Sequence, residues 1–202
     1  MRYGPDHKQA THTRILAAAQ SLFRKQGFAG ASVEKVMRAA GLTVGGFYAH
    51  FASKEALLAE SLRTFMQQSR MRWVGGLEGL RGREWLSPFV RRYLNPQIRD
   101  NLKSGCMMPS LWSDLTRASP STQAVLIEEL ELLLREVEAR LRDEPGATAR
   151  QRALATVAMC FGTMTLARAT RSQPLSDELL QAAHAFLLAS EQESSPRRDG
   201  SG

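Results

Sequence analysis

Hydrophobic positions in the first third of the chain predict short helical segments in close succession. The first segment follows Ser32, a candidate N-cap, and buries a face spaced i, i+3, i+4 and i+7: Val33, Val36, Met37 and Ala40. Gly41 then supplies a turn. Thr43 can cap a second segment over residues 43–51, and Ser53 can cap a third. This order indicates a helix-turn-helix motif, with 43–51 as the recognition helix.

The second segment has an almost bare outer face. At about 100° per residue, Gly45, Gly46 and Ala49 point away from Phe47 and Phe51. Two glycines in a short helix cost on the order of 1 kcal/mol each relative to alanine, so we expect this face to approach another backbone closely. Tyr48, His50 and Lys54 would contact phosphates around it. The candidate DNA-binding residues are Ser32, Thr43, Val44, Gly45, Gly46, Tyr48, Ala49, His50 and Lys54.

About the first 63 residues resemble the DNA-binding domain of TetR-type (TetR/AcrR) transcriptional regulators. The residues that carry the resemblance are Ile15, Ala18, Ala19, Leu22, Phe23, Gly27, Phe28, Gly41, Gly45, Tyr48, His50, Phe51, Ser53, Lys54, Glu55 and Leu57. The resemblance implies an all-α protein of about nine helices, with a three-helix DNA-binding domain and a larger ligand-binding and dimerisation domain. It also implies a homodimeric repressor that binds a palindromic double-stranded operator and is released by a small-molecule effector.

Two positions depart from the commonest pattern of that family. Val44 stands where many relatives carry a cationic residue, and Ala49 where many carry an aromatic one. Val44 could contact a thymine methyl group or pack inward. The operator sequence therefore cannot be carried over from a relative.

Charge is concentrated in the part of the chain that holds the motif. The 202 residues carry a formal net charge of +7, and residues 1–63 contain nine Lys and Arg against four Asp and Glu. A local cationic surplus suits binding to a polyanion. Any one of these cations, such as Arg24, Lys25 or Lys35, is as readily a solvated surface charge.

The expected organisation is a DNA-binding domain over residues 1–63, a regulatory domain over 64–190 and a disordered tail over 191–202. Residues 1–10 form a polar arm, which we expect to be disordered, with insertion into a neighbouring minor groove as the alternative. One helix should run from Ser53 through the domain boundary towards Trp73, and later helices are expected near 84–94, 106–118, 120–143, 149–172 and 176–190. In 120–143, Glu131/Arg135, Glu136/Arg140 and Glu138/Arg142 are candidate i, i+4 pairs.

Several classes of protein are excluded by composition. No apolar run approaches the roughly 18 residues of a membrane span and no secretion signal precedes the motif, so we expect no membrane contact and a cytoplasmic location. Two cysteines and four scattered histidines give no disulfide framework and no metal-ligand spacing. We therefore expect no metal and no cofactor.

Two surfaces of the regulatory domain stand out. Small side chains form one stripe of the helix at 149–172, and the resemblance assigns it, with the last helix, to the dimer interface: Ala155, Ala158, Gly162, Thr165, Ala169, Leu179, Leu180, Ala183, Phe186 and Leu187. Burial within one subunit is the alternative. A cluster of aromatic and thioether groups is a candidate apolar ligand pocket or an ordinary core: Trp73, Trp85, Phe89, Tyr93, Met107, Met108, Leu111 and Trp112. Arg91, Arg92 and Arg99 could supply its polar end.

Cys106 is a candidate sensor thiol. Gly105-Cys106 opens a predicted helix, whose dipole would lower the thiol pKa, and the pair resembles TetR-type regulators that sense reactive species. A small buried hydrophobic residue is the alternative, which we also assign to Cys160. A remote alternative is a hydrolase with Cys106 as nucleophile and His184 as base, but we expect no enzyme and no catalytic residues. A DNA-coating protein without operator preference is a further alternative.

Overall fold

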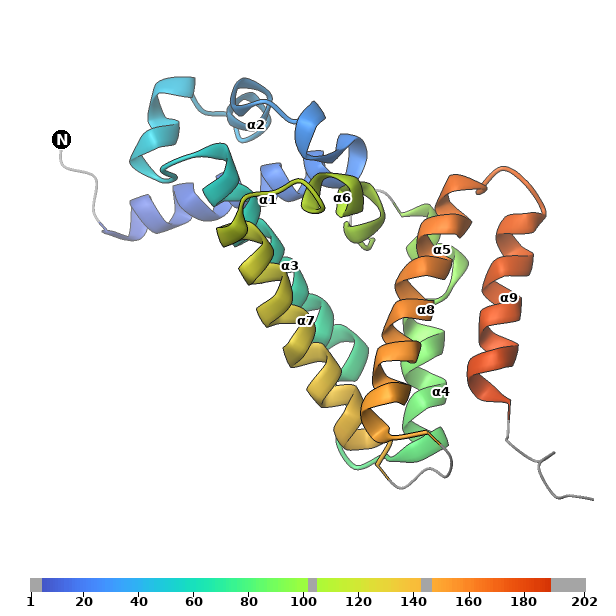
Figure 1. The fold of residues 1–202 in the computed structure, drawn as a ribbon. Helices are drawn as coiled ribbons and strands as arrows, with labels where there is room; N and C mark the ends of the chain where they lie inside the picture. Colours follow the sequence, from blue (N-terminus) through green and yellow to red (C-terminus); the bar gives the residue numbers. More distant parts are fainter. Residues whose placement is uncertain (1–4, 102–104, 143–146, 190–202) are drawn as a thin grey trace, which may run out of the picture.

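The computed structural model describes residues 5–101, 105–142 and 147–189. Within these ranges it contains nine α-helices and one 3₁₀ helix, so the expected all-α fold is confirmed (Figure 1). The expected tail at 191–202 and the first four residues of the expected arm lie outside the described residues.

The N-terminal domain is built from α1 (Pro5–Gly30), α2 (Val33–Ala39), the 3₁₀ helix η1 (Val44–Ala49) and the first turns of α3 (Lys54–Val74). Both serine caps are confirmed, because Ser32 Oγ accepts from the Lys35 amide at 3.3 Å and Ser53 Oγ accepts from the Ala56 amide at 3.0 Å. The buried side chains of this core include Ile15, Ala19, Phe23, Val36, Met37, Phe47, Phe51, Leu57, Leu58 and Leu62.

The polar segment at 1–10 is not an arm throughout, because α1 already begins at Pro5. Proline suits the first helical position, and Asp6 in the first turn is stabilised by the helix dipole. Further along α1, His12 stacks on Phe51 with ring centroids 4.4 Å apart, and its Nε2 lies 2.5 Å from Glu60 Oε1 on α3. These contacts hold this stretch of α1 against the rest of the domain.

The larger domain contains six further helices: α4 (Gly82–Tyr93), α5 (Pro96–Asp100), α6 (Met108–Leu115), α7 (Pro120–Arg140), α8 (Ala149–Ala169) and α9 (Leu175–Leu188). α7 packs along α3, and α8 packs between α7 and α9 (Figure 1). Glu129 of α7 is fully buried and pairs with Arg70 of α3 at 3.3 Å, with Gln67 donating a second hydrogen bond. Each charge is therefore balanced across the α3–α7 contact.

Helix boundaries differ from expectation in two places. The helix expected over 106–118 is α6, which starts only at Met108, and α5 was not expected at all. Asn95 caps α5 by accepting from the Ile98 amide at 2.9 Å, with Pro96 at the first position. Five residues are too few to show a helical hydrophobic period.

The ion pairs of α7 also differ in part from the expected i, i+4 pairs. Glu136 and Arg140 form the expected i, i+4 pair at 3.1 Å. Glu131 instead pairs with Arg150 of α8 at 2.6 Å, and Glu138 lies 4.0 Å from the same guanidinium. These α7 carboxylates therefore join two helices, because α8 packs against the face that the sequence alone assigned to solvent.

Two connections link the N-terminal domain to the larger domain. The first is α3, which crosses the expected boundary at residue 63 without interruption. The second is the contact between the end of α1 and α6, where the Phe28 amide donates to Asp114 Oδ2 at 2.8 Å and Ser110 Oγ donates to the Arg24 carbonyl at 2.7 Å. No helix in the described part of the chain is long and apolar enough to cross a membrane.

Candidate nucleic-acid interface

The predicted recognition helix is anchored by one aromatic residue. Phe47 is fully buried and its ring lies 5.7 Å from that of Phe51. The segment is a 3₁₀ helix over 44–49 rather than an α-helix over 43–51. Its bonds include Gly46 N to Thr43 O at 3.2 Å and His50 N to Phe47 O at 2.9 Å, and Thr43 makes no side-chain cap. Two glycines in six residues weaken the α-helical preference and leave the tighter turn.

Neither glycine of this helix is required by the chain itself. The positive φ values among the described residues belong to other glycines, including Gly41 at the expected turn. A Cβ built on Gly45 meets no atom within 4 Å, and one on Gly46 meets Met37 Cε at an ordinary 3.7 Å. Space and backbone conformation would therefore both admit alanine at these two positions.

The outward face agrees only in part with the helical-wheel expectation, because Gly46 is half-buried. Thr43, Gly45 and Ala49 are exposed. Tyr48 is 70% exposed and stands edge-on against Phe47 with ring centroids 5.2 Å apart, so its hydroxyl points away from the core. Val44 is 43% exposed, which favours its outward alternative over inward packing.

Two of the three expected phosphate contacts are oriented differently. The His50 ring is half-buried beside His12, with centroids 5.9 Å apart, and its Nδ1 is buried without a hydrogen-bond partner among the described residues. Burial, followed by the charges of His12 and Lys8, lowers the pKa of His50. Lys54 Nζ lies 4.1 Å above the Phe28 ring, and burial lowers its pKa as well. Both groups would have to turn outward to bind a phosphate.

Several polar residues of this domain make hydrogen bonds within the protein. The Ser32 hydroxyl caps α2, and Lys35 Nζ donates to the Gly30 carbonyl at 2.8 Å. Arg14 Nη2 donates to the Ala40 carbonyl at 2.7 Å and so supports the turn. Sequence reasoning missed that α1 places Lys8 close enough to influence His50; Pro5-Asp6 as a helix start was the available signal.

The eight residues of the candidate ligand pocket are mostly core. Trp85 and Phe89 stack at 4.6 Å, while Trp73 and Tyr93 meet edge-on at 4.8 Å. Met107, Met108 and Leu111 are fully buried, and only Trp73 and Trp112 of the eight line a hollow described here. Phe161, which the pocket prediction omitted, contacts three of these aromatic rings: Trp73, Tyr93 and Trp112.

A cavity of about 250 Å³ lies where α3, α4, α5 and the segment before α6 meet, lined by Ser69, Arg72, Trp73, Arg92, Ile98, Gly105 and Cys106. Of the three expected polar residues, Arg92 lines it. Arg99 is instead buried in ion pairs with Asp100 and Asp177, which raise its pKa. The expected polar end is therefore supplied in part by Arg72, because α3 runs alongside.

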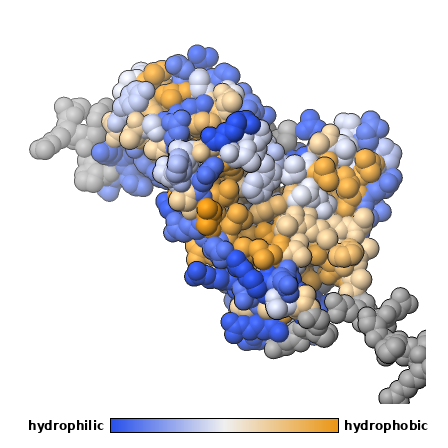
Figure 2. Space-filling model, in the orientation of Figure 1, coloured by the Kyte–Doolittle hydropathy of each residue, from blue (hydrophilic) through white to orange (hydrophobic). Residues whose placement is uncertain are grey.

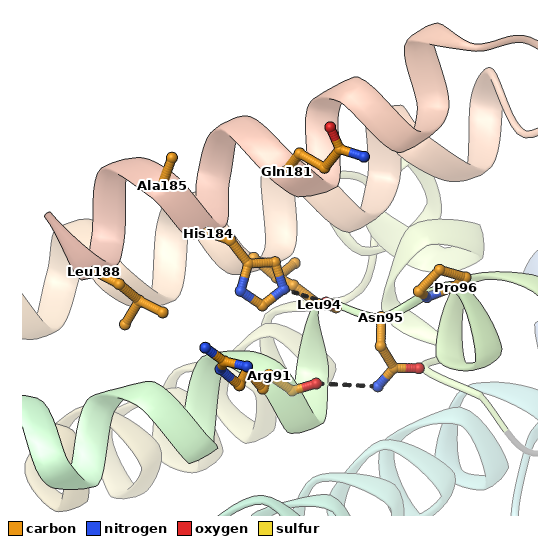
Figure 3. Close-up of a pocket in the computed structure, with 8 residues that line it drawn as sticks. All are labelled: Arg91, Leu94, Asn95, Pro96, Gln181, His184, Ala185 and Leu188. Atoms are coloured by element: carbon orange, nitrogen blue, oxygen red, sulfur yellow. Dashed lines mark hydrogen bonds between the residues drawn. The ribbon is translucent and has the colours of Figure 1, made fainter.

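Arg91 lines a different hollow, of about 680 Å³, between α4 and α9 (Figure 3). The His184 ring lies over Leu94 there, and its Nε2 is 2.6 Å from the Leu94 carbonyl oxygen, which accepts a hydrogen bond. Cys106 lines the cavity of about 250 Å³ and not this hollow, so no described contact pairs it with His184 as the hydrolase alternative requires.

Cys106 does not open a helix, since α6 starts two residues later. Its thiol is buried and accepts a hydrogen bond from Tyr93 Oη at 3.2 Å. Burial raises the pKa of Cys106, although the Tyr93 hydrogen bond and the charges of Arg168 and Arg24 oppose this. The expected lowering of the thiol pKa was wrong because desolvation outweighs the local dipoles. Burial also raises the pKa of Cys160, to about 12.

The residues of the candidate dimer surface differ in their exposure. Ala155, Ala158, Gly162 and Ala169 are exposed on α8, and a Cβ on Gly162 would meet nothing within 4 Å. Phe186 is 72% exposed on α9. Leu180 and Ala183 are buried within the subunit, so their assignment to the interface was wrong: their face of α9 packs on its own neighbouring helices. Thr165, Leu179 and Leu187 are half-buried.

An apolar groove of about 530 Å³ adjoins the small stripe, lined by Trp112, Leu130, Leu134, Leu154, Val157, Ala158, Phe161, Gly162, Thr165 and Leu166. Figure 2 shows hydrophobic side chains gathered over the space between α7 and α8. Leu154 and Leu166 remain about half-exposed at 45% and 55%. Single exposed leucines are common on soluble proteins, whereas a continuous apolar patch indicates a binding surface.

Known proteins resemble this chain in two ways. Residues 15–61 match the model of the bacterial regulatory proteins of the tetR family. The transcriptional regulator UidR of Escherichia coli K12 is 35% identical over 72 residues, which are 36% of this chain and 37% of UidR. The repressor KstR2 of Rhodococcus jostii is 37% identical over 59 residues, 29% of each protein. The matches thus span 37% of UidR and 29% of KstR2.

Solved structures resemble nearly the whole chain. The reduced form of E. coli NemR has a TM-score of 0.76 at 21% identity, covering 88% of this chain and 95% of NemR. FadR of Bacillus subtilis, in complex with stearoyl-CoA, has a TM-score of 0.71 at 17% identity, covering 88% and 97%. At these identities the likeness establishes the fold.

Proposed function

We propose that the chain belongs to the tetR family of bacterial regulatory proteins and that it represses transcription as a homodimer on a palindromic operator until a small ligand releases it. The observation that carries the proposal is the glycine pair of η1. Gly45 and Gly46 are required neither by φ nor by packing, and Gly45 leaves a smooth exposed face beside Tyr48. Such a face can enter the major groove with little steric hindrance.

Selection from random duplex oligonucleotides tests the proposal. The full chain should enrich a palindrome, because two copies related by a twofold axis bind two equivalent half-sites. The Tyr48→Phe variant should bind the selected duplex roughly tenfold more weakly, the effect of about 1.4 kcal/mol for one lost hydrogen bond to a phosphate. Met71→Leu, an exposed residue on α3, is the control and should bind normally. Enrichment without palindromic symmetry, or unchanged binding by Tyr48→Phe, would contradict the proposal.

The exposed faces of α8 and α9 are proposed as the dimer interface. Small residues such as Ala158 and Gly162 allow two helices to approach closely, and the half-exposed Leu154 and Leu166 supply apolar area beside them. The partner that binds this surface is a second copy of the chain, because in a twofold-symmetric dimer the same surface of each subunit forms the interface.

Ligand control requires a structural link between the regulatory and DNA-binding domains. Helix α3 provides one, since Trp73 and Arg72 at its far end line the cavity while Ser53 and Lys54 begin it beside η1. The α1–α6 contact provides another, through Phe28 and Asp114. A ligand that binds one arrangement of these helices more tightly shifts the population towards it.

Thiol sensing through Cys106 is a second candidate. Cys106 lines the cavity, accepts a hydrogen bond from Tyr93 and lies near two guanidiniums that favour a thiolate. The chain also shares its fold with NemR, whose solved structure is described as the reduced form. The raised pKa of Cys106 means that reaction would be slow unless the site opens.

The Cys106→Ser variant distinguishes the two release mechanisms. It should bind the selected operator like the wild type, because serine is nearly isosteric. If the thiol is the sensor, a quinone or diamide should release the wild-type protein and Cys160→Ser but leave Cys106→Ser bound. Equal release of all three proteins would eliminate Cys106 as the sensor.

A further inference from the structure

The cavity beside Cys106 holds two guanidiniums from different helices. Arg72 comes from α3 and Arg92 from α4, and both line the cavity. Their hydrogen bonds go to neutral oxygens: Arg92 Nη1 donates to the Trp73 and Gly75 carbonyls at 3.2 and 2.7 Å, and Arg72 Nη2 donates to Ser69 Oγ at 3.3 Å. These bonds orient the two groups without neutralising their charge.

Two further guanidiniums donate hydrogen bonds to backbone carbonyls in and next to the segments that line the cavity. Arg168 of α8 donates to the carbonyls of Ile98, Arg99 and Cys106, and Arg24 Nε of α1 donates to the Gly105 carbonyl at 3.0 Å. Burial, then the charge of Arg72, lowers the pKa of Arg24, and burial also lowers the pKa of Arg168. Positive charge is thus concentrated where solvation is poor.

The carboxylates of the described residues form no ion pair with three of these four guanidiniums. Among the described residues, the ion pairs include neither Arg72, Arg92 nor Arg168. Asp100 is the weakest influence on Arg168 and is committed to Arg99. Glu78 is affected only weakly by Arg92, and its carboxylate accepts from the Gly76 amide. A cluster of partly desolvated guanidiniums without paired carboxylates is stabilised by an added anion.

We propose that this cavity binds a small organic anion, with its carboxylate or phosphate between Arg72 and Arg92 and its apolar part against Trp73 and Ile98. Guanidinium donors are suited to both oxyanions. The volume of about 250 Å³ is below the roughly 300–1,000 Å³ of a site for a drug-sized ligand, so the anion is compact. This inference rests on the proposed ligand-released repressor and names the class of its effector.

An anion bound in this cavity would affect the contacts of α1 and α3, the two helices that connect the cavity to the DNA-binding domain. An anion would draw Arg72, which is part of α3, towards Arg92 on α4. It would also contact the segment whose Gly105 carbonyl accepts from Arg24 of α1. The bound and empty states therefore differ in contacts to α1 and α3, which is what a differential effect on operator binding requires.

Binding by the full-length protein is measured by tryptophan fluorescence and calorimetry, with benzoate and phenyl phosphate as probes and benzamide as the neutral analogue. We expect saturable binding of at least one anion below about 1 mM and at least tenfold weaker binding of benzamide. Preference between the two anions identifies the oxyanion. Arg72→Met and Arg92→Met should each lower anion affinity at least tenfold, while Arg91→Met, next to the cavity but lining the other hollow, should not.

The same variants separate this proposal from the repressor function. Arg72 is exposed, so Arg72→Met should fold and bind the selected operator like the wild type. Equal binding of benzamide and benzoate, unchanged affinity in both cavity variants, or no saturable anion binding would overturn the anion site while leaving operator binding intact. Loss of operator selection by the wild type would instead refute the repressor function.

Discussion

Substitution of Gly45 separates stability from DNA binding. A Cβ at this position meets no atom within 4 Å and φ is not positive, so Gly45→Ala and Gly45→Leu introduce neither a clash nor backbone strain. Replacing a helical glycine reduces the entropy of the unfolded chain, which stabilises the folded state by up to about 1 kcal/mol. For a chain of this size the Tm rises by roughly 2–4 °C per kcal/mol.

DNA binding should change in the opposite direction. The added side chain stands on the face proposed to approach the operator, so the helix would have to withdraw or tilt. We expect a modest loss for Gly45→Ala and at least a tenfold loss for Gly45→Leu, about 1.4 kcal/mol. Fluorescence anisotropy with the selected duplex measures affinity, and a thermal melt of the same samples measures stability.

Gly79→Leu is the matched control. Its Cβ also meets nothing within 4 Å, but the residue lies in the turn before α4, away from η1. It should bind the operator normally. Wild-type affinity in a folded Gly45→Leu variant would refute close approach by η1, and an equal loss in Gly79→Leu would show that the effect is not local.

Three further predictions concern stability and assembly. Burial lowers the pKa of His50, so the folded state disfavours protonation of this side chain. The free energy of unfolding should therefore be highest above the unfolded-state pKa of about 6.5 and should decrease as the pH falls below it. Urea melts should show a smaller decrease for His50→Asn. Arg99→Met removes the pairing with Asp177, whose half-exposed carboxylate water can solvate, so calorimetry should show a loss of about 1–3 kcal/mol rather than unfolding. Leu166→Asp should give monomers by light scattering, whereas Ile127→Asp, equally exposed on α7 but outside the groove, should stay dimeric; a dimeric Leu166→Asp would place the interface elsewhere.

Local features of the fold could be predicted because their causes are local. Ser32 and Ser53 cap helices through bonds to amides three residues away, and Gly41 turns the chain because its own φ is positive. The inward position of Phe47 and the exposure of Tyr48 follow from helical period alone. Pro5 and Asp6 were a local signal for the start of α1 as well, but the polar composition of residues 1–10 favoured an arm instead.

The environment of a charged or reactive group depends on elements far away in the chain. Whether Cys106 has a low or a high pKa depends on burial by helices that pack around it, and whether Lys54 faces solvent depends on Phe28 of α1. Likewise Arg99 pairs with Asp177 of α9, so it is withdrawn from the cavity that Arg72 enters. None of these partners is within one helical turn in sequence.

The sequence by itself determined the all-α class, the helix-turn-helix order and the bare face of Gly45 and Gly46, because caps, turns and periodicity act over three or four residues. Only the tertiary structure decided that Leu180 and Ala183 are internal and that arginines from α3 and α4 meet at one cavity. Burial and electrostatic interaction depend on distance in space, and that distance is set by how the helices pack.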